Sequence, residues 1–358
     1  MNNKLQTFAF AVLFGILSAL TLSSCATPEQ RIDSIMKKFS TPNGPGASVL
    51  VMQNDSILFK KSYGLANLEE QRAVTPATNF RLASMTKQFT AMCIMMLAEQ
   101  GKLSYDDKLS KFFPKLPRWG DSVTVKNLLT HTSGIVDYES LIPDSQTVQV
   151  HDDDVLKLVR TVDSTYFPVG SQYRYSNSGY SLLALIVEKV SGERFADFLK
   201  HHIFDVVGMP TTVAFENGIS TVENRAYGYA KEDNTWKFAD QSNTSAVLGD
   251  GGIYSNVEEL AKWYTALFAN TLIPKETQQR AWTKAATTDG KEIDYGFGWH
   301  FEEYKGITHP RHGGSTRGFR NEVQVYPDQH LVIIILTNRD EGDPMDEGHA
   351  IADLYVHH

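Results

Sequence analysis

Ser84 and Lys87 are three residues apart, a spacing that could support nucleophilic chemistry. A strand-like segment at 80–83 precedes the serine, and the apolar residues that follow it, up to Gly101, predict a buried helix. Positions i and i+3 lie on one helix face, so the lysine ammonium can approach the serine hydroxyl. A lysine acts as a base only when its pKa falls from about 10.4 towards 7, which needs about 4 kcal/mol of desolvation and nearby positive charge. The pair therefore predicts a serine nucleophile and a lysine base, provided that a second positive or polar group converges on Lys87.

The same spacing occurs once more, at Ser34 and Lys37, and the surroundings distinguish the two pairs. The earlier copy lies in a charged stretch with no strand before it, so its lysine should stay protonated and solvated. We interpret it as an exposed helix face. Ser84 is preferred because it begins an apolar, core-facing helix.

A second polar segment, Tyr175-Ser176-Asn177, lies between a turn at 168–170 and an expected helix at 178–190. A phenol near a lysine ammonium has its pKa lowered, so Tyr175 could shuttle a proton. The amide of Asn177 could hold both Lys87 and a substrate carbonyl. These two residues therefore join the candidate site.

The tripeptide Tyr-Ser-Asn recurs at 254–256. There, Ser255 followed by Glu258 predicts a capping box that opens a helix through Phe268. We interpret this second copy as structural.

A third segment, His312-Gly313-Gly314-Ser315, precedes the C-terminal hairpin. Two glycines on an edge strand mark a place where another backbone or a ligand approaches closely. The backbone N–H of Ser315, with that of Ser84, could form an oxyanion hole. His312 would stand beside the cleft as a proton donor or substrate contact. Asn177, His312, Gly314 and Ser315 are thus the expected substrate-binding residues.

The elements that must position these residues are strands at both ends of the chain and helices between them. One hairpin is expected at 47–52 and 56–63, and another at 321–326 and 330–337, whose apolar run 331–336 suits a strand buried on both faces. Helices are expected at 84–100, 155–162, 178–190, 195–204, 255–268 and after Pro344. This order predicts an α+β fold in one domain, 45–358, whose antiparallel sheet is built from the N- and C-terminal segments. A mainly helical region, about 100–250, is inserted into it.

The first residues are expected to lie outside the fold. Lys4 and a mostly apolar run at 8–22 have the length of a signal peptide, short of the roughly 20 residues that span a bilayer. The run ends in Leu-Ser-Ser-Cys, which resembles a bacterial lipobox. We therefore expect a lipoprotein signal peptide at 1–24, a lipidated Cys25 and a tether at 25–44; the alternative is an ordinary signal peptide cut nearby. The other cysteine, Cys93, is expected to be a buried, inert thiol.

Charge and histidine spacing exclude other classes of function. The chain of 358 residues has a formal net charge of −8, which argues against a nucleic-acid partner. The pairs His309/His312 and His201/His202 lack convincing partner ligands, so no metal site is expected. No Gly-x-Ser-x-Gly segment occurs, which excludes an α/β-hydrolase.

The three segments together resemble the class C β-lactamase and penicillin-binding-protein superfamily of serine hydrolases. That family carries Ser-x-x-Lys, Tyr-x-Asn and Lys/His-x-Gly in this chain order. Here 91 residues separate Ser84 from Tyr175, and 137 separate Tyr175 from His312, which is similar to the family's layout. The stretches 128–134, 251–255 and 313–319 also look like this family, and the resemblance runs from about 45 to 340.

The resemblance implies a β-lactamase/transpeptidase-like fold and a two-step acyl transfer without a cofactor or metal. Ser84 attacks a carbonyl while Tyr175 with Lys87 removes its proton, and a water activated by Tyr175 later releases the acyl group. The segment around His131 and the second Tyr-Ser-Asn are expected to be structural turns.

One departure concerns the substrate, because His312 stands where β-lactamases and transpeptidases typically carry lysine. Histidine is largely neutral near pH 7 and does not supply that fixed charge for a substrate carboxylate, so efficient β-lactam hydrolysis is not implied. Relatives with histidine here include esterases, D-amino-acid peptidases and other amide hydrolases. We expect a serine hydrolase of small esters, amides or D-amino-acid peptides, including peptidoglycan-derived ones, anchored at Cys25 in the bacterial cell envelope. The alternative is a penicillin-binding or sensor lipoprotein that acylates with little turnover.

Overall fold

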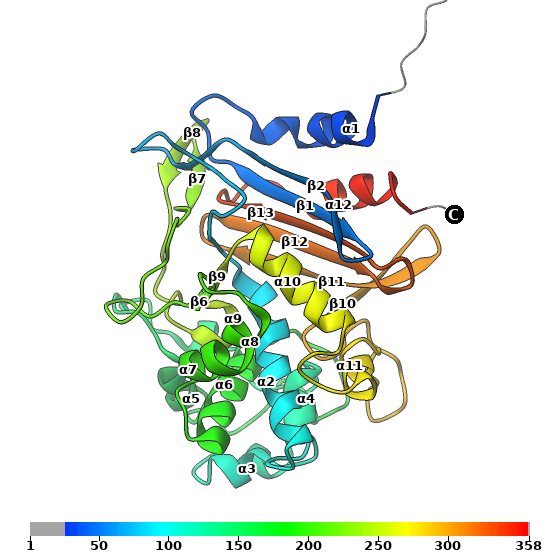
Figure 1. Ribbon diagram of the computed structural model, residues 1–358. Coiled ribbons are helices and arrows are strands. Elements are labelled where there is room, and N and C mark those ends of the chain that lie inside the picture. The colour runs from blue at the N-terminus through cyan, green and yellow to red at the C-terminus, as the bar shows by residue number, and fades with distance from the viewer. Residues whose placement is uncertain (1–25, 357–358) are drawn as a thin grey trace, which may run out of the picture.

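A six-stranded antiparallel sheet with the order β10-β11-β12-β13-β1-β2 forms the centre of the computed structural model, which describes residues 26–356 (Figure 1). Its strands are β1 (Ala47–Gln53), β2 (Ser56–Tyr63), β10 (His300–Tyr304), β11 (Ile307–Thr316), β12 (Phe319–Tyr326) and β13 (Leu331–Thr337). β1 pairs with β2 on one side and with β13 on the other, so the two ends of the chain share one sheet. Both expected hairpins and the α+β class are thereby confirmed. The expected leader and the lipidation of Cys25 lie outside the described residues and stay predictions.

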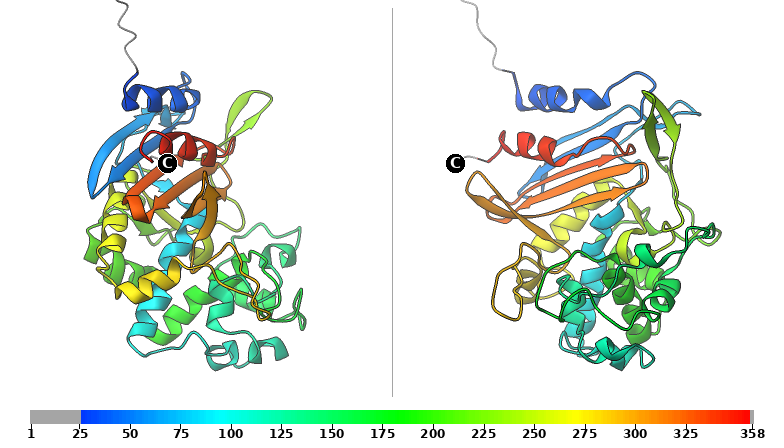
Figure 2. Two further views of the ribbon diagram at one scale, coloured as in Figure 1. Left: turned by 90° about the vertical axis from the view of Figure 1, so that its right-hand side faces the viewer. Right: turned by 180° about the vertical axis from the view of Figure 1, so that it is seen from behind.

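Two layers of helices cover the two faces of this sheet, which explains the unbroken apolar sequence of β13. On one face, Ile333 and Ile335 pack in a core cluster with α1 (Pro28–Ile35) and α12 (Met345–Ala352). On the other, Ile334 and Leu336 belong to the main core with α2 (Lys87–Glu99) and α10 (Val257–Phe268). Figure 2 shows α1 and α12 on the side of the sheet opposite to the helical region.

The chain between β2 and β10 builds this helical region and three small sheets. Its further helices are α3 (Leu109–Phe112), α4 (Val125–Leu129), α5 (Asp152–Val159), α6 (Asn177–Ser191), α7 (Phe195–Leu199), α8 (Asp205–Val207), α9 (Leu248–Gly251) and α11 (Lys275–Ala281). The small strands are β3 (Leu65–Asn67), β4 (Arg72–Ala73), β5 (Phe80–Arg81), β6 (Val213–Ala214), β7 (Tyr229–Glu232), β8 (Thr235–Phe238) and β9 (Ile253–Ser255). Cys93 is buried on α2 with a free thiol, as expected. Within the described range, no helix has the length and apolar character needed to cross a membrane.

The start of α10 corrects one expectation about capping. Asn256, and not Ser255, caps this helix: its Oδ1 accepts the N–H of Glu259 at 3.0 Å. Ser255 is the last residue of β9, and its hydroxyl shares a 2.7 Å hydrogen bond with that of Thr212. Because the strand holds Ser255 extended and its hydroxyl engaged, the cap falls one residue later.

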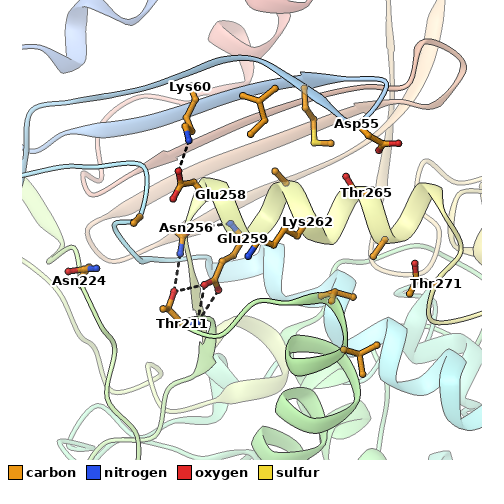
Figure 3. A pocket seen from close by; sticks show the side chains of 17 residues that line it. Asp55, Lys60, Thr211, Asn224, Asn256, Glu258, Glu259, Lys262, Thr265 and Thr271 are labelled. Carbon is orange, nitrogen blue, oxygen red and sulfur yellow. Dashed lines mark hydrogen bonds and ion pairs between the residues drawn. The ribbon is translucent and has the colours of Figure 1, made fainter.

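A cavity of about 710 Å³ lies on the flank formed by β2, α8 and α10, away from all of the predicted site residues (Figure 3). Its charged and polar side chains are largely satisfied by one another. Lys60 pairs with Glu258, and the Glu259 carboxylate accepts the N–H of Thr211 at 3.0 Å. None of the predicted catalytic or substrate-binding residues borders this cavity, so the candidate chemistry lies elsewhere.

Candidate active site

Ser84 lies at the junction between the sheet and the helical region, in a 3-10 turn (Ala83–Thr86) that leads directly into α2. Ala83, the residue before it, has a φ of +51°, a left-handed conformation that L-residues adopt only under constraint. The first N–H groups of such a turn have no partner within it, and no side chain caps this one. No acceptor for the N–H of Ser84 is found within residues 26–356, so this group can bind an oxyanion.

Lys87 is the first residue of α2 and is fully buried. Its Nζ donates to Ser84 Oγ at 3.2 Å, to Asn177 Oδ1 at 2.8 Å and to the backbone oxygen of Asp250 at 2.9 Å. The three acceptors occupy all three N–H bonds of an ammonium and fix its position. The structure thus brings Ser84, Lys87 and Asn177 together, as the sequence predicted.

Burial lowers the pKa of Lys87, while the nearby carboxylates of Asp250, Asp137 and Glu139 oppose that shift. The neutral amine is therefore more accessible than in an exposed lysine. The second group that converges on Lys87 is the polar Asn177, and no cationic side chain of the part of the chain that the structure describes contacts Lys87. Desolvation alone supplies the change that a lysine base requires.

Tyr175 reaches the same point, but its ionisation differs from the expectation. Lys87 Nζ lies 4.8 Å from the centre of the Tyr175 ring, facing the π system, with no hydrogen bond to the hydroxyl. Burial raises the pKa of Tyr175, the carboxylates of Asp250, Asp137 and Glu139 raise it further, and the Ser84 hydroxyl opposes this only in part. The predicted lowering of the Tyr175 pKa is therefore wrong. The sequence did not indicate that Tyr175 is buried or that three carboxylates lie near it. The Tyr175 hydroxyl stays protonated and has no hydrogen-bond partner of normal geometry among the described residues.

An aromatic wall that sequence reasoning missed holds Tyr175 in place. The rings of His131 and His300 lie 4.3 Å and 5.8 Å from that of Tyr175, the second one stacked. His131 Nδ1 also accepts the N–H of Ser176 at 3.1 Å, which fixes the backbone beside the tyrosine. The segment at 128–134, expected to be only a structural turn, therefore positions a site residue. In the sequence, only the similarity of residues 128–134 to the family pattern could have indicated this role.

Three acidic residues complete the surroundings of Lys87, and none of them was predicted. Glu139 Oε1 accepts from Asn177 Nδ2 at 3.2 Å, while the other end of that amide holds Lys87. Asp137 Oδ1 accepts the N–H of Ser178 at 3.3 Å, and the Asp250 carboxylate accepts from Tyr138 at 3.0 Å. The negative charge of this cluster offsets the buried ammonium.

His312 lies beside the cleft on β11, but its side chain faces inward and is only 1% exposed. Its Nε2 pairs with the Tyr295 hydroxyl at 3.1 Å, and its Nδ1 with the oxygen of Gly313 at 2.7 Å. Burial lowers its pKa well below the ordinary value for histidine, so the ring is neutral at physiological pH. The absence of a fixed positive charge, inferred from the residue type, is thus reinforced by its surroundings.

Gly314 allows β11 to reach the turn that carries the nucleophile. A Cβ at this position would lie 2.1 Å from the backbone oxygen of Leu82, so no larger residue fits. On the same face, Asn321 Nδ2 donates to the backbone oxygen of Arg81 at 2.8 Å. From the sequence, the glycine pair could mark the approach of either another backbone or a ligand. The structure shows a close approach of two backbones.

Ser84 separates two hollows in the surface. The larger, about 500 Å³, is lined by Tyr175, His300 and His312, and the smaller, about 50 Å³, by Tyr138 and Glu139. Ser84, Asn177 and Ser315 line both hollows. β10 pairs with β11 only as far as Arg311, so residues 312–316 present a strand edge that no described strand covers. An extended substrate could pair with this edge while its carbonyl faces Ser84.

Comparison with known proteins gives consistent matches over most of the chain. A family model described as Beta-lactamase matches residues 32–357. The chain is 34% identical to penicillin-binding protein 4* of Bacillus subtilis, over 82% of this chain and 68% of that protein. It is 28% identical to a D-aminopeptidase of Brucella ovis, over 85% of this chain and 58% of that enzyme, so it spans less than two thirds of that relative.

Solved structures match just as broadly. A penicillin-binding protein homologue from Pyrococcus abyssi superposes with a TM-score of 0.78 at 26% identity, over 91% of this chain and 76% of that one. A D-amino acid amidase from Ochrobactrum anthropi gives a TM-score of 0.78 at 21% identity, over 91% and 98%, which shows the shared fold. The β-lactamase/transpeptidase-like fold predicted from the sequence is confirmed.

Proposed function

The chain belongs to the β-lactamase family of serine hydrolases, and from this premise we propose that it cleaves amides and peptides of D-amino acids through an acyl-enzyme on Ser84. The observation that carries the assignment of the nucleophile is the 3.2 Å contact between Lys87 Nζ and Ser84 Oγ in a buried site. The D-aminopeptidase among the relatives supports the substrate class.

Acylation begins with neutral Lys87, whose lone pair accepts the hydroxyl proton of Ser84 as Oγ bonds to the substrate carbonyl carbon. The oxygen of that carbonyl becomes an oxyanion. Ser84 and Ser315 both line the two hollows, and their backbone N–H groups would hold it. This arrangement stabilises charge that exists only in the transition state and the tetrahedral intermediate.

Tyr175 is the proposed acid for the leaving group, because its raised pKa keeps it protonated. When the C–N bond breaks, its hydroxyl gives a proton to the leaving nitrogen, while Lys87 keeps the proton that it took from Ser84. A water then attacks the acyl carbon. In this second step the Tyr175 phenolate accepts a proton from the attacking water, and Lys87 returns its proton to Ser84 Oγ as the acyl group leaves. The sequence suggested that Tyr175 helps to remove the Ser84 proton during acylation. With its raised pKa, Tyr175 is instead proposed to act as an acid in that step.

The smaller hollow suits the acyl part of such a substrate. The Glu139 carboxylate borders it beside Asn177, and Asp137 and Asp250 add negative charge nearby. A D-amino-acid amide carries a free ammonium next to the carbonyl that Ser84 attacks. Arg81 also borders this hollow, but its Nε and Nη2 donate to the backbone oxygens of Gly251 and Ser245. The carboxylates on the other side of the hollow favour that ammonium over a neutral or anionic acyl group.

The test compares D-alanine p-nitroanilide with its L-isomer, together with fluorophosphonate labelling of the serine. We expect turnover with a preference for the D-isomer and labelling of Ser84. Preference for the L-isomer would exclude the proposed substrate class. Labelling without turnover of any amide or ester would favour the alternative, a penicillin-binding or sensor protein that acylates and deacylates slowly.

The pH dependence of kcat/KM should show whether Lys87 is the base. Because only neutral Lys87 accepts a proton, kcat/KM is expected to rise with pH along a limb centred below the ordinary lysine pKa of about 10.4. Burial lowers the pKa of His300 to about 4 and those of His131 and His312 below their ordinary value, so these rings add no limb near neutrality. Steady-state rates across the pH range measure the limb, with thermal unfolding at each pH as the control. A rate that falls as pH rises through neutrality would contradict a lysine base.

We further propose that the protein is a lipoprotein of the cell envelope, anchored at Cys25 by the lipobox-like end of its apolar leader. Cys25→Ala is then expected to move the protein from the membrane fraction to the soluble fraction. Cys93→Ala, which alters the buried thiol, is the matched control and should leave it in the membrane. Membrane retention of the Cys25 variant would show that the attachment does not depend on that residue.

A further inference from the structure

Glu139, Asn177 and Lys87 form a chain of two hydrogen bonds that ends at the base. Glu139 Oε1 accepts from Asn177 Nδ2 at 3.2 Å, and Asn177 Oδ1 accepts from Lys87 Nζ at 2.8 Å. In such a chain each bond polarises the next, so a carboxylate on the amide nitrogen makes the amide oxygen a better acceptor for an ammonium. The chain therefore favours the protonated form of Lys87, which cannot act as a base.

The carboxylate at the start of this chain is open to substrate. Glu139 is exposed, whereas Lys87 is fully buried. Among residues 26–356, Glu139 Oε2 makes no hydrogen bond, and Glu139 forms no ion pair with a lysine, arginine or histidine. It lines the smaller hollow together with Ser84 and Asn177. An ammonium that enters this hollow can thus pair with Glu139 without displacing a side chain of the fold.

The charges around Lys87 act in the same direction as the chain. Burial lowers the pKa of Lys87, and the carboxylates of Asp250, Asp137 and Glu139 each raise it. Asp250 and Asp137 are at least partly buried, so Glu139 is the exposed member of this group. The other titratable groups around Lys87 are uncharged at neutral pH: His131, His300 and His312, whose pKa values are lowered, and Tyr175 and Tyr180, whose pKa values are raised.

We propose that the ammonium of a D-aminoacyl substrate, paired with Glu139, supplies the positive charge that none of the described side chains brings to Lys87, and so converts Lys87 to its basic form. This inference rests on the proposed function and adds a control of its base. Pairing neutralises the carboxylate and places a like charge near Lys87, and both effects disfavour the lysine ammonium.

The protons balance in two steps. When the substrate ammonium arrives, Lys87 releases one proton to the solvent. Its neutral amine then accepts the hydroxyl proton of Ser84 as Oγ bonds to the carbonyl carbon. An acyl group without a charge leaves the chain intact, so acylation by such a substrate is slow even where it fits the hollow. Selection for the ammonium therefore acts on kcat as well as on KM.

Two anilides of the same shape separate this effect from ordinary binding. D-alanine p-nitroanilide carries the ammonium, and isobutyric acid p-nitroanilide carries a methyl group in its place. The pH profile of kcat/KM reports the free protein and free substrate, whereas that of kcat reports their complex. The ammonium of the D-alanine anilide, with a pKa of about 7.7–8.0, is titrated separately and its ionisation is divided out of kcat/KM.

With the full-length protein and the D-alanine anilide, the rising limb of kcat is expected about one pH unit below that of kcat/KM. With the isobutyric anilide the two limbs should coincide, because nothing neutralises Glu139. Coinciding limbs for the D-alanine anilide, or an equal separation for both anilides, would overturn the proposal.

Glu139→Gln removes the charge but keeps an acceptor for Asn177. The limb of kcat/KM with the isobutyric anilide is then expected to move to lower pH, and the rate below that limb to rise by up to about tenfold. The D-alanine anilide should instead react more slowly, through KM. Loss of a merely structural contact would slow both anilides. Glu303→Gln is the matched control, because Glu303 is an exposed glutamate on β10 that borders neither hollow.

A second readout does not depend on turnover. Labelling of Ser84 by an uncharged fluorophosphonate needs the same base, so its rate should rise with pH along the same limb. This limb is expected to move to lower pH in Glu139→Gln and to stay in place in Glu303→Gln. If the wild type hydrolyses neither anilide, the proposed function fails, while labelling still decides whether Glu139 restrains Lys87. A limb that stays in place in Glu139→Gln overturns the inference whether or not turnover occurs.

Discussion

Ser84→Ala is expected to lower kcat for D-alanine p-nitroanilide by roughly a million-fold, to the level left by substrate binding and the oxyanion hole. Ser315 is the other described serine that borders both hollows, and its hydroxyl makes no hydrogen bond to a base within residues 26–356. The hydrogen bond from Lys87 is the contact that the Ser84 hydroxyl makes, so stability should change little. Turnover assays and fluorophosphonate labelling measure the loss, and thermal unfolding shows that the variant is folded.

Ser34→Ala is the matched control, because Ser34 begins the other Ser-x-x-Lys of the chain. Ser34 and Lys37 are both exposed, which confirms the interpretation of that copy as a solvated helix face. Its replacement should leave labelling and rate unchanged. Retained labelling of the Ser84 variant would show that a different residue is the nucleophile.

Lys87→Met is expected to lower kcat/KM by at least about a thousand-fold and to remove the limb that rises with pH. Its effect on stability should also be measurable. The substitution leaves the oxygens of Asn177 and Asp250 without their buried donor, and each unsatisfied group costs about 1–3 kcal/mol. The Asp250 carboxylate, whose pKa burial raises, can take up a proton and limit this loss.

Lys60→Met is the control for the removal of a lysine. Lys60 pairs with Glu258 on the flank shown in Figure 3, away from Ser84. Rate, pH profile and unfolding temperature are compared for both variants. A Lys87 variant that kept its rate and its pH limb would show that another group accepts the proton.

Much of the candidate site could be predicted from local spacing, because some of its residues are close together in the sequence. Ser84 and Lys87 share one turn, and Tyr175 and Asn177 share one tripeptide, so each pair could be placed from its motif. Likewise, the antiparallel sheet followed from two hairpins with alternating or continuous apolar residues. These features depend on neighbours in the chain, which a sequence displays.

The remaining features arise from distant segments that meet in the folded chain. Asp250 contacts Lys87 across 163 residues, and His131 contacts Ser176 across 45, with no spacing rule that connects them. The direction of the Tyr175 pKa shift also depends on groups that are distant in the sequence. A phenol near a lysine suggests a lowered pKa, whereas burial and distant carboxylates determine the opposite.

Because Gly314 packs directly against the backbone of Leu82, the site can form only after the C-terminal strands have been made. The nucleophile's turn comes from the first third of the sequence, yet its backbone rests on β11 and on Asn321, from the last fifth. During synthesis, Ser84 and Lys87 leave the ribosome long before the strand that completes their cleft. A partly made or C-terminally shortened chain would thus lack a competent cleft even where α2 had formed. We therefore expect hydrolysis to report complete folding, because the strand that completes the cleft is made late.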